Sequence, residues 1–281
     1  MAIEVRPHGR VGAEILGLDL AAIDDEALAQ VRCVFAEHGV VFFRDQQISE
    51  EQHIAFARRI GPINTNRFFA AHPAHPEIAL VIKEPHHRDN IGGGWHTDHS
   101  YDAIPALGSI LVARELPQSG GATSFASMYA AYEGLPGSLR QRLDNARAVH
   151  SARHVFGSKA SAYAAASDTR AGRIGNASAA DVLEDVIHPA IITHPLSGKR
   201  AIYINPGFTT RILGLSDAES DALIAEVFAH CQNPAYHSTF TWQPGSVALW
   251  DNRATWHYAH NDYHGQRREM HRITIEGEPL H

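Results

Sequence analysis

The sequence predicts a mainly β fold with flanking helices, either a β-barrel or a double-sheet jelly roll of the cupin kind. Short apolar segments rich in β-branched and aromatic residues recur along the chain. Turns that contain Gly or Pro, such as Gln243-Pro244-Gly245, separate these segments. Fewer segments have the periodicity of a helix. The expected strands are residues 40–43, 107–114, 186–193, 200–205, 238–242, 246–250 and 269–275.

Helical signals occupy four parts of the chain, and we expect these helices to lie outside the strands. Two of them begin with a capping box, in which a serine is followed three residues later by Gln or Glu. These pairs are Ser49 with Gln52 and Ser216 with Glu219. The expected helices are residues 23–38, 49–60, 217–230 and a stretch near 127–145.

The composition predicts one folded domain over residues 1–281. Hydrophobic residues make up 44% and charged residues 20%, which allows a sizeable core. The net charge of −7 argues against nucleic acid or a membrane surface as a partner, because such proteins usually carry a basic patch. We find neither a membrane-spanning apolar run nor the core of a signal peptide. Cys33 and Cys231 give no disulfide framework, so we expect a cytoplasmic protein.

The segment 157–181 interrupts the pattern of strands and helices. It is rich in Ala, Ser and Gly and has weak periodicity. Two interpretations stay open: a surface insertion, or a mobile lid over an active site, since long loops in compact domains are often functional.

A His-x-Asp pair in residues 92–99 predicts a metal site. In an extended segment residues i and i+2 point to the same side, so His96 and Asp98 can offer a nitrogen and an oxygen to one ion. The best candidate for a third ligand is His257, which follows the strand expected at 246–250. Two histidines and one carboxylate on one face of an ion leave positions open for an α-keto acid and O₂. Iron(II) suits this role because it can supply electrons to O₂, whereas zinc cannot change its redox state.

The alternative interpretation of this pair is a surface histidine beside a capping aspartate. Other histidines could also be combined into metal sites, but their Pro- or Arg-rich surroundings are typical of solvated loops. These histidines are His72, His75, His86, His87, His260, His264 and His271.

Two arginines near the C-terminus have the spacing of one strand face. In the expected strand, Arg268 and Arg272 lie on one face, and Ile273 and Ile275 lie on the other. The arginines are either exposed to solvent or, inside a barrel that holds a metal, positioned to bind a carboxylate. Arginine suits carboxylate binding because its planar guanidinium forms paired hydrogen bonds and stays charged.

Several motifs in this order resemble the taurine dioxygenase family of iron(II)- and 2-oxoglutarate-dependent oxygenases. This family also contains alkylsulfate and aryloxyalkanoate dioxygenases. The resemblance covers nearly the whole chain, and together the ordered motifs are far more specific than His-x-Asp by itself. The motifs are Trp95-His96-Thr97-Asp98, Gly120-Gly121-Ala122-Thr123, the segments 194–199 and 205–211, and Trp250-Asp251-Asn252-Arg253.

The resemblance implies a double-stranded β-helix fold, with Fe(II), 2-oxoglutarate and O₂ as cofactor and cosubstrates. It implies that His96, Asp98 and His257 are the iron ligands. It also implies that Arg268 and Thr123 hold the distal carboxylate of 2-oxoglutarate. Arg272 matches the arginine that lies beside the metal-bound carboxylate and contacts the substrate anion in the taurine enzymes. We also expect a homo-oligomer, a dimer or a tetramer.

The substrate pocket departs from the pattern of the taurine enzymes, because several of their polar anchors are missing. This favours the hydroxylation of an alkyl or aryl sulfonate, sulfate or carboxylate, with succinate and CO₂ as co-products, since a buried charged group without a partner is costly. A taurine dioxygenase proper stays as an alternative, as do a cupin-like metal-dependent hydrolase and a binding module. The residues that the alignment places in the pocket are Asn66, Phe69, His99, Val155, Phe156, Phe208 and Arg272.

Overall fold

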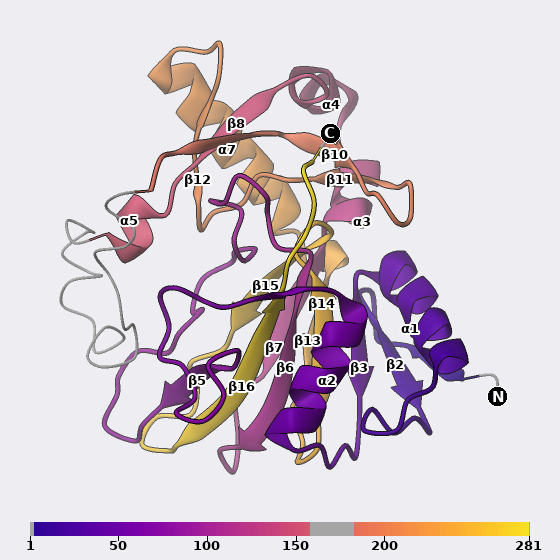
Figure 1. Cartoon of the computed structure of the whole chain (residues 1–281). Coiled ribbons are helices and arrows are strands. Elements are labelled where there is room, and N and C mark those ends of the chain that lie inside the picture. Colours follow the sequence, from indigo (N-terminus) through magenta and orange to yellow (C-terminus); the bar gives the residue numbers. More distant parts are fainter. Residues whose placement is uncertain (1–2, 158–182, 281) are drawn as a thin grey trace.

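The computed structural model describes residues 3–157 and 183–280. The chain has a mixed α/β fold that consists mostly of strands, with some helices (Figure 1). The segment 157–181, for which we considered an insertion or a lid, lies outside the described residues apart from Gly157. No helix in the described part of the chain is both long enough and apolar enough to cross a bilayer.

A large sheet of eight strands forms one layer of the molecule. Its strands pair antiparallel, with one parallel pair between the second and third. In spatial order the strands are β1 (Glu4–Pro7), β2 (Ala13–Leu16), β3 (Val40–Phe43), β14 (Val247–Asp251), β6 (Gly108–Glu115), β16 (Arg268–Ile275) and β4 (Ile63–Asn64), and β5 (Ala79–Lys83) also pairs with β16.

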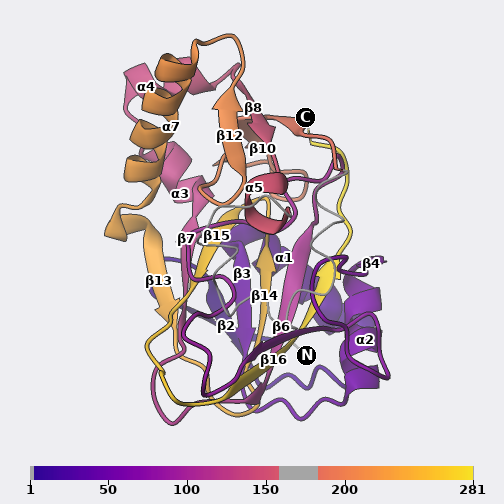
Figure 2. The same ribbon diagram turned by 90° about the vertical axis from the view of Figure 1, so that its left-hand side faces the viewer.

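The remaining described strands form three small sheets. One of them lies against the large sheet (Figure 2); it contains β13 (His237–Phe240), β7 (Thr123–Ser127) and β15 (Thr255–Ala259). The second contains β12 (Thr209–Ile212), β8 (Arg147–His150) and β9 (Val186–Pro189). The third contains β10 (Ile191–Thr193) and β11 (Arg200–Ile202).

Helices α1 (Asp25–His38) and α2 (Glu50–Ile60) cover the outer face of the large sheet (Figure 1). Both capping boxes expected from the sequence are present, at Ser49 and Ser216. The stretch near 127–145 forms two short helices rather than one, because Gly134 interrupts it. The other helices are α3 (Met128–Glu133), α4 (Gly137–Leu143), α5 (Arg153–Phe156), α7 (Asp217–Cys231) and the 3₁₀ turn η2 (Pro234–Tyr236).

The two faces of the large sheet belong to different cores, as the period of a strand requires. In β3, Val41 and Phe43 pack beneath α1 and α2. Val40 and Phe42 point the other way, into a core shared with Phe125 of the three-stranded sheet. Side chains from both sheets therefore fill the space between them. The polar residues of the candidate functional site lie in this space.

All seven segments expected as strands contain strands, with boundaries that shift by a few residues. The expectation of a closed jelly roll is met only in part. Within residues 3–157 and 183–280, the sheets are separate and no ladder of hydrogen bonds joins them into a closed barrel. The strand β15 pairs with β7 and not with a strand of the large sheet, so the layers face each other as a sandwich.

Candidate functional site

His96 and His257 are brought together by an isolated β-bridge. The His96 amide donates to the His257 carbonyl at 3.1 Å, and the His257 amide donates to the His96 carbonyl at 2.8 Å. The two ring centroids are 4.1 Å apart. His257 lies inside β15 rather than after the preceding strand, and this strand fixes its direction.

Asp98 completes a cluster of three donors. Its Oδ1 is 3.8 Å from Nε2 of His96, and its Oδ2 is 3.8 Å from Nε2 of His257. The ligand atoms of all three residues lie within 4.8 Å of one another. Two imidazole nitrogens and a carboxylate oxygen at this separation fit a divalent transition metal bound on one face.

The orientation of His96 favours coordination through Nε2. Its Nδ1 lies 2.7 Å from the carbonyl oxygen of Gly94, which can only accept a hydrogen bond. The proton is therefore on Nδ1, and the lone pair of Nε2 faces Asp98. Gly207 packs against this histidine, and a Cβ at Gly207 would lie 2.7 Å from the Cβ of His96.

The protonation states of the three donors are those that a metal requires. Burial lowers the pKa of His96, and burial followed by repulsion from His96 lowers the pKa of His257, so both rings are neutral. Burial by itself would raise the pKa of Asp98. The nearby Arg272 guanidinium and both histidines outweigh burial and hold the pKa of Asp98 below its usual range. A cation can thus bind two neutral imidazoles and a carboxylate without first displacing protons.

Arg272 contacts the carboxylate of this cluster with one of its nitrogen atoms, and two other nitrogen atoms have no acceptor among the described residues. Its Nη1 is 3.0 Å from Oδ1 of Asp98. Its Nε and Nη2 are buried without a hydrogen-bond partner in the described part of the structure. The guanidinium carbon lies over the ring of Phe69, 4.7 Å from the ring centroid. Buried N–H groups are rarely left unsatisfied, so these two donors indicate a place for an anion.

Arg268, the first residue of β16, also has buried donors without a hydrogen-bond partner in the described part of the structure. It is 5% exposed, and its Nε and Nη2 have no hydrogen-bond partner among the described residues. Gly121 leaves room for it, because a Cβ at Gly121 would lie 3.3 Å from Nε of Arg268. Thr123 accepts a hydrogen bond from the indole of Trp242 at 2.9 Å, so its own hydroxyl proton points elsewhere.

One cavity of about 640 Å³ contains both arginines, Thr123 and the three-donor cluster. Part of its wall is apolar and aromatic. Phe156 stacks on the buried Phe68 with centroids 4.5 Å apart, and Tyr101 contacts Phe208 edge to face at 4.7 Å. Of the pocket residues expected from the alignment, Phe69, Val155, Phe156, Phe208 and Arg272 line this cavity.

Asn66 and His99 were also expected in the pocket, but neither is among the described residues that line the cavity. They instead contact each other, with Asn66 Nδ2 3.2 Å from His99 Nε2. Tyr101, which the sequence did not single out, lines the cavity in their place.

Asn252 supports the turn that contains His96 and Asp98. The Thr97 hydroxyl donates to the carbonyl of Asn252 at 2.5 Å, and the Asp98 amide lies 3.4 Å from its side-chain oxygen. That oxygen also accepts from the indole of Trp250 at 2.9 Å. In addition, the Ser109 hydroxyl donates to Oδ2 of Asp98 at 3.1 Å. The motif at 250–253 is the sequence signal for these contacts of Asn252, but the sequence alone does not give the pairs of atoms that form them.

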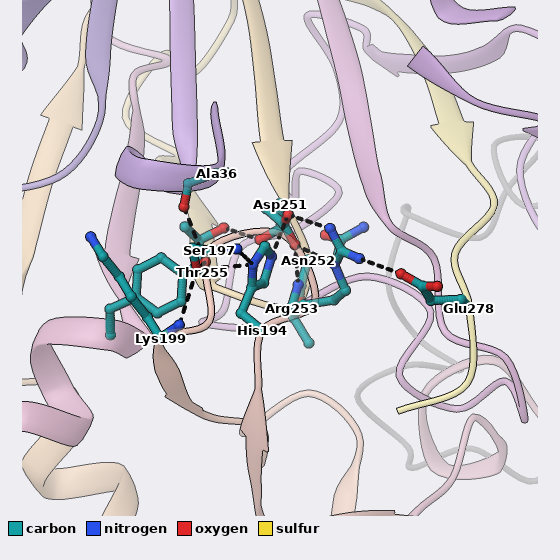
Figure 3. A network of polar contacts seen from close by, with 11 residues as sticks. Ala36, His194, Ser197, Lys199, Asp251, Asn252, Arg253, Thr255 and Glu278 are labelled. Carbon is teal, nitrogen blue, oxygen red and sulfur yellow. Dashed lines mark hydrogen bonds and ion pairs between the residues drawn. The ribbon is translucent and has the colours of Figure 1, made fainter. Parts of the chain in front are cut away.

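A buried ionic network holds the turn that contains Asn252 (Figure 3). Both nitrogen atoms Nε and Nη2 of Arg253 donate to the Asp251 carboxylate, at 2.9 and 2.8 Å. The ring of His194 lies 2.9 Å from the same carboxylate. Arg253 and His194 hold the pKa of Asp251 below its usual range, although burial opposes this. All three side chains are at most 1% exposed.

A second cluster, Glu50, His72 and His271, also has donor atoms within 4.8 Å of one another. His271 was expected in a solvated loop, but it is buried in β16. Arg114 Nε lies 3.2 Å from its Nδ1, and Glu269 lies 3.0 Å from its Nε2, so both ring nitrogens are engaged. A guanidinium inside the cluster disfavours a second cation there.

The chain is similar to known proteins over nearly its whole length. The family profile described as "Taurine catabolism dioxygenase TauD, TfdA family" matches residues 4–274. An alpha-ketoglutarate-dependent sulfate ester dioxygenase from Pseudomonas putida is 32% identical over 99% of this chain and 91% of that protein. A (S)-phenoxypropionate/alpha-ketoglutarate-dioxygenase from Sphingobium herbicidovorans is 33% identical over 99% and 96%. The crystal structure of a taurine dioxygenase from Burkholderia xenovorans has a TM-score of 0.80 and 31% identity, and the match covers 100% of this chain and 93% of that one.

Proposed function

The chain belongs to the taurine catabolism dioxygenase TauD, TfdA family, and from this premise we propose that it uses iron(II), O₂ and 2-oxoglutarate to hydroxylate a small organic anion. As a member of this family it is a 2-oxoglutarate-dependent dioxygenase, an oxidoreductase. The hydrolase and the binding module considered from the sequence are therefore set aside.

The observation that carries the proposal is the convergence of three metal donors and two buried arginines in one cavity. In our proposal His96, Asp98 and His257 hold the iron. The lone pair of His96 Nε2, the burial of both rings and the ionised carboxylate all support this assignment. The donor set suits iron(II), because two imidazoles and one carboxylate on one face leave other positions open.

The two arginines have separate roles in this proposal. Arg268 and Thr123 bind the distal carboxylate of 2-oxoglutarate, and Arg272 lies beside its opposite end. The unsatisfied Nε and Nη2 of each arginine support this, since a bound carboxylate would supply the missing acceptors. Burial strengthens such charge-assisted hydrogen bonds, because water does not compete for the donors.

When bound, iron supplies the redox chemistry that couples the conversion of 2-oxoglutarate and O₂ to succinate and CO₂ with hydroxylation of a C–H bond. The protein binds and orients the reactants. Arg268 and Arg272 fix the two ends of the cosubstrate. The aromatic wall excludes water and holds the organic part of the substrate near the three donors.

For the substrate we propose an alkyl or aryl sulfonate, sulfate ester or carboxylate rather than taurine. Phe69, Val155, Phe156 and Phe208 line the cavity with uncharged side chains. Asn66 is not among the described residues that line the cavity, and its side-chain oxygen already accepts hydrogen bonds from the backbone amides of Phe68 and Phe69, so it does not offer an acceptor to the ammonium group of taurine. The names of the sulfate ester and phenoxypropionate relatives support this range of substrates.

The test is a screen of oxygen uptake and succinate release with iron(II) and 2-oxoglutarate. It should include taurine, alkyl sulfates, alkyl sulfonates and aryloxyalkanoates, with the His257→Ala variant as the control. We expect at least one alkyl or aryl anion to stimulate succinate release well above the rate with taurine. If taurine gives the fastest turnover, the proposed substrate class is wrong.

We also propose that residues 1–281 form one catalytic domain. Strands β1 and β16, from near the two ends of the chain, belong to one sheet, and this arrangement supports the proposal.

A further inference from the structure

His99 directly follows the candidate metal ligand Asp98 and is held in an unusual conformation. Its φ is 57°, in the left-handed region that only a few per cent of non-glycine residues adopt, histidine more often than most. It is 1% exposed. Its Nδ1 lies 2.9 Å from Oδ2 of Asp102, a carboxylate oxygen, so Nδ1 is the donor. A backbone cost at such a position persists only when surrounding contacts maintain it.

The other nitrogen of His99 ties this turn to a distant segment. Asn66 accepts the backbone N–H groups of Phe68 and Phe69 on its Oδ1, at 2.9 and 3.0 Å. These bonds fix the orientation of the amide, so its NH₂ group faces Nε2 of His99 and donates to it at 3.2 Å. Asn66 thus joins the His99 ring to the backbone of Phe69.

Two more contacts join the same pair of segments. Arg67 Nη2 lies 2.8 Å from Oδ1 of Asp102, so one carboxylate binds both His99 and Arg67. Phe68 packs edge to face on Tyr101, with centroids 5.7 Å apart. Residues 66–68 therefore each contact the turn at 99–102, and the segment can lie against it in only one register.

Phe69 directly follows this segment and connects it, through Arg272, to the cluster of His96, Asp98 and His257. The Phe69 ring lies under the guanidinium of Arg272 at 4.7 Å. Arg272 in turn donates to Asp98 at 3.0 Å. A closed path of contacts thus runs from Asp98 through His99, Asn66 and Phe69 to Arg272, and back to Asp98.

We propose that His99 is a positioning residue which, through Asn66, fixes Phe69 beneath Arg272 and so holds Arg272 in the orientation that binds 2-oxoglutarate. The proposal rests on the proposed function, because it assumes that Arg272 contacts the cosubstrate. It replaces the direct substrate contact that the alignment suggested for His99 and Asn66. If His99 served only to fill the core, its bond to Asn66 would have no influence on cosubstrate affinity.

Two substitutions distinguish a positioning role of His99 from a role in core packing alone. Each substitution preserves the hydrogen bond that one of the two ring nitrogens makes and loses the other. In His99→Asn the amide nitrogen can take the place of Nδ1 and keep the bond to Asp102, and asparagine tolerates the left-handed φ. It is too short to reach Asn66. In His99→Gln the side-chain amide reaches the position of Nε2, and its oxygen can accept from Asn66.

The experiment measures two quantities for the wild type and both variants. One is amide exchange in the peptide that contains residues 66–69. The other is the affinity of the iron(II)-loaded protein for 2-oxoglutarate, by anaerobic calorimetry. We expect His99→Asn to accelerate exchange and to weaken 2-oxoglutarate binding, each by roughly fivefold, as the loss of one hydrogen bond and of one cation–π contact would predict. We expect His99→Gln to stay within about twofold of the wild type, well inside the effect of one such contact.

Equal effects of the two variants, or an unchanged affinity in His99→Asn despite faster exchange, would overturn the proposal. Failure of the proposed function gives a different result, because then the wild type itself would not bind 2-oxoglutarate when loaded with iron(II). The exchange measurement needs no ligand, so it reports on the contact between His99 and Asn66 in either case.

Discussion

Arg272 and Asp98 form a buried ion pair in which Nη1 of the arginine lies 3.0 Å from one carboxylate oxygen and 3.2 Å from the other. The same carboxylate faces both candidate histidine ligands. The arginine keeps the carboxylate ionised and, in our proposal, also binds the cosubstrate. In our proposal the metal site and the cosubstrate site therefore share one charged pair, and a change in either residue should affect both.

The first prediction concerns this pair in the metal-free protein. Asp98→Ala removes the partner of a buried guanidinium, so we expect the free energy of unfolding to fall by about 3 kcal/mol. Urea denaturation measures this. Ser109→Ala is the matched control, because it removes only one hydrogen bond to Asp98 and should cost about 1 kcal/mol. Equal losses in the two variants would mean that Arg272 does not depend on Asp98.

The second prediction tests Arg268. Arg268→Gln removes the charge and part of the hydrogen-bonding fork, so we expect the KM for 2-oxoglutarate to rise roughly 10- to 100-fold. The control is Arg267→Gln, one residue earlier on the chain. Arg267 points away from the cavity and pairs with Glu84 and Glu269, so its substitution should leave this KM within about twofold, because partly exposed ion pairs contribute little. Steady-state succinate formation at varied 2-oxoglutarate distinguishes them, and similar effects in both variants would contradict the assignment.

The third prediction is a pH dependence of stability that comes from buried histidines outside the site. Burial lowers the pKa of His53 and of His150 from 6.5 to about 3. Between these values the unfolded chain binds protons that the folded chain does not, so stability falls as the pH drops below 6.5. From pH 7 to pH 5 each histidine should cost about 2 kcal/mol.

Urea denaturation at pH 7 and pH 5 measures this cost directly. In His53→Leu the difference between the two pH values should shrink by about 2 kcal/mol relative to the wild type. His86→Gln, at an exposed position, is the control and should keep the full difference. An undiminished pH dependence in His53→Leu would show that His53 titrates normally in the fold.

The fourth prediction compares a buried ion pair, drawn in Figure 3, with an exposed ion pair on the surface. Asp251→Ala leaves Arg253 and His194 buried without their carboxylate, so we expect a loss of about 3 to 5 kcal/mol of unfolding free energy. Lys199→Ala breaks only an exposed pair with Glu37, which should cost less than about 1 kcal/mol. Denaturant titration of both variants gives the comparison, and equal losses would contradict a structural role for Asp251.

Local patterns in the sequence were sufficient for most of the fold. The capping boxes at Ser49 and Ser216 place α2 and α7 to within about one residue, because a cap depends only on neighbouring residues. The strand at 268–275 alternates as expected, with Met270 in the inner core and Ile273 in the outer one. Several short strands, such as β7 and β15, were not expected, because the pairing between distant segments determines them.

The part of the candidate site that depends on neighbouring residues could be predicted from the sequence. The pairing of His96 with Asp98 follows from the period of an extended segment. The bridge to His257 and the ion pair between Arg272 and Asp98 depend on how sheets pack, which spacing alone does not reveal. The contact between Asn66 and His99 was missed for the same reason, since each was assigned separately to the pocket.

The most direct test of the central claim is the amount of iron that the protein retains after anaerobic loading and desalting. If His96, Asp98 and His257 meet at one ion, the wild type should retain about one iron(II) per chain and should bind 2-oxoglutarate only when iron is present. His257→Ala should retain almost none. If His257→Ala retains as much iron as the wild type and still binds 2-oxoglutarate, the metal lies elsewhere and the account of this site is wrong.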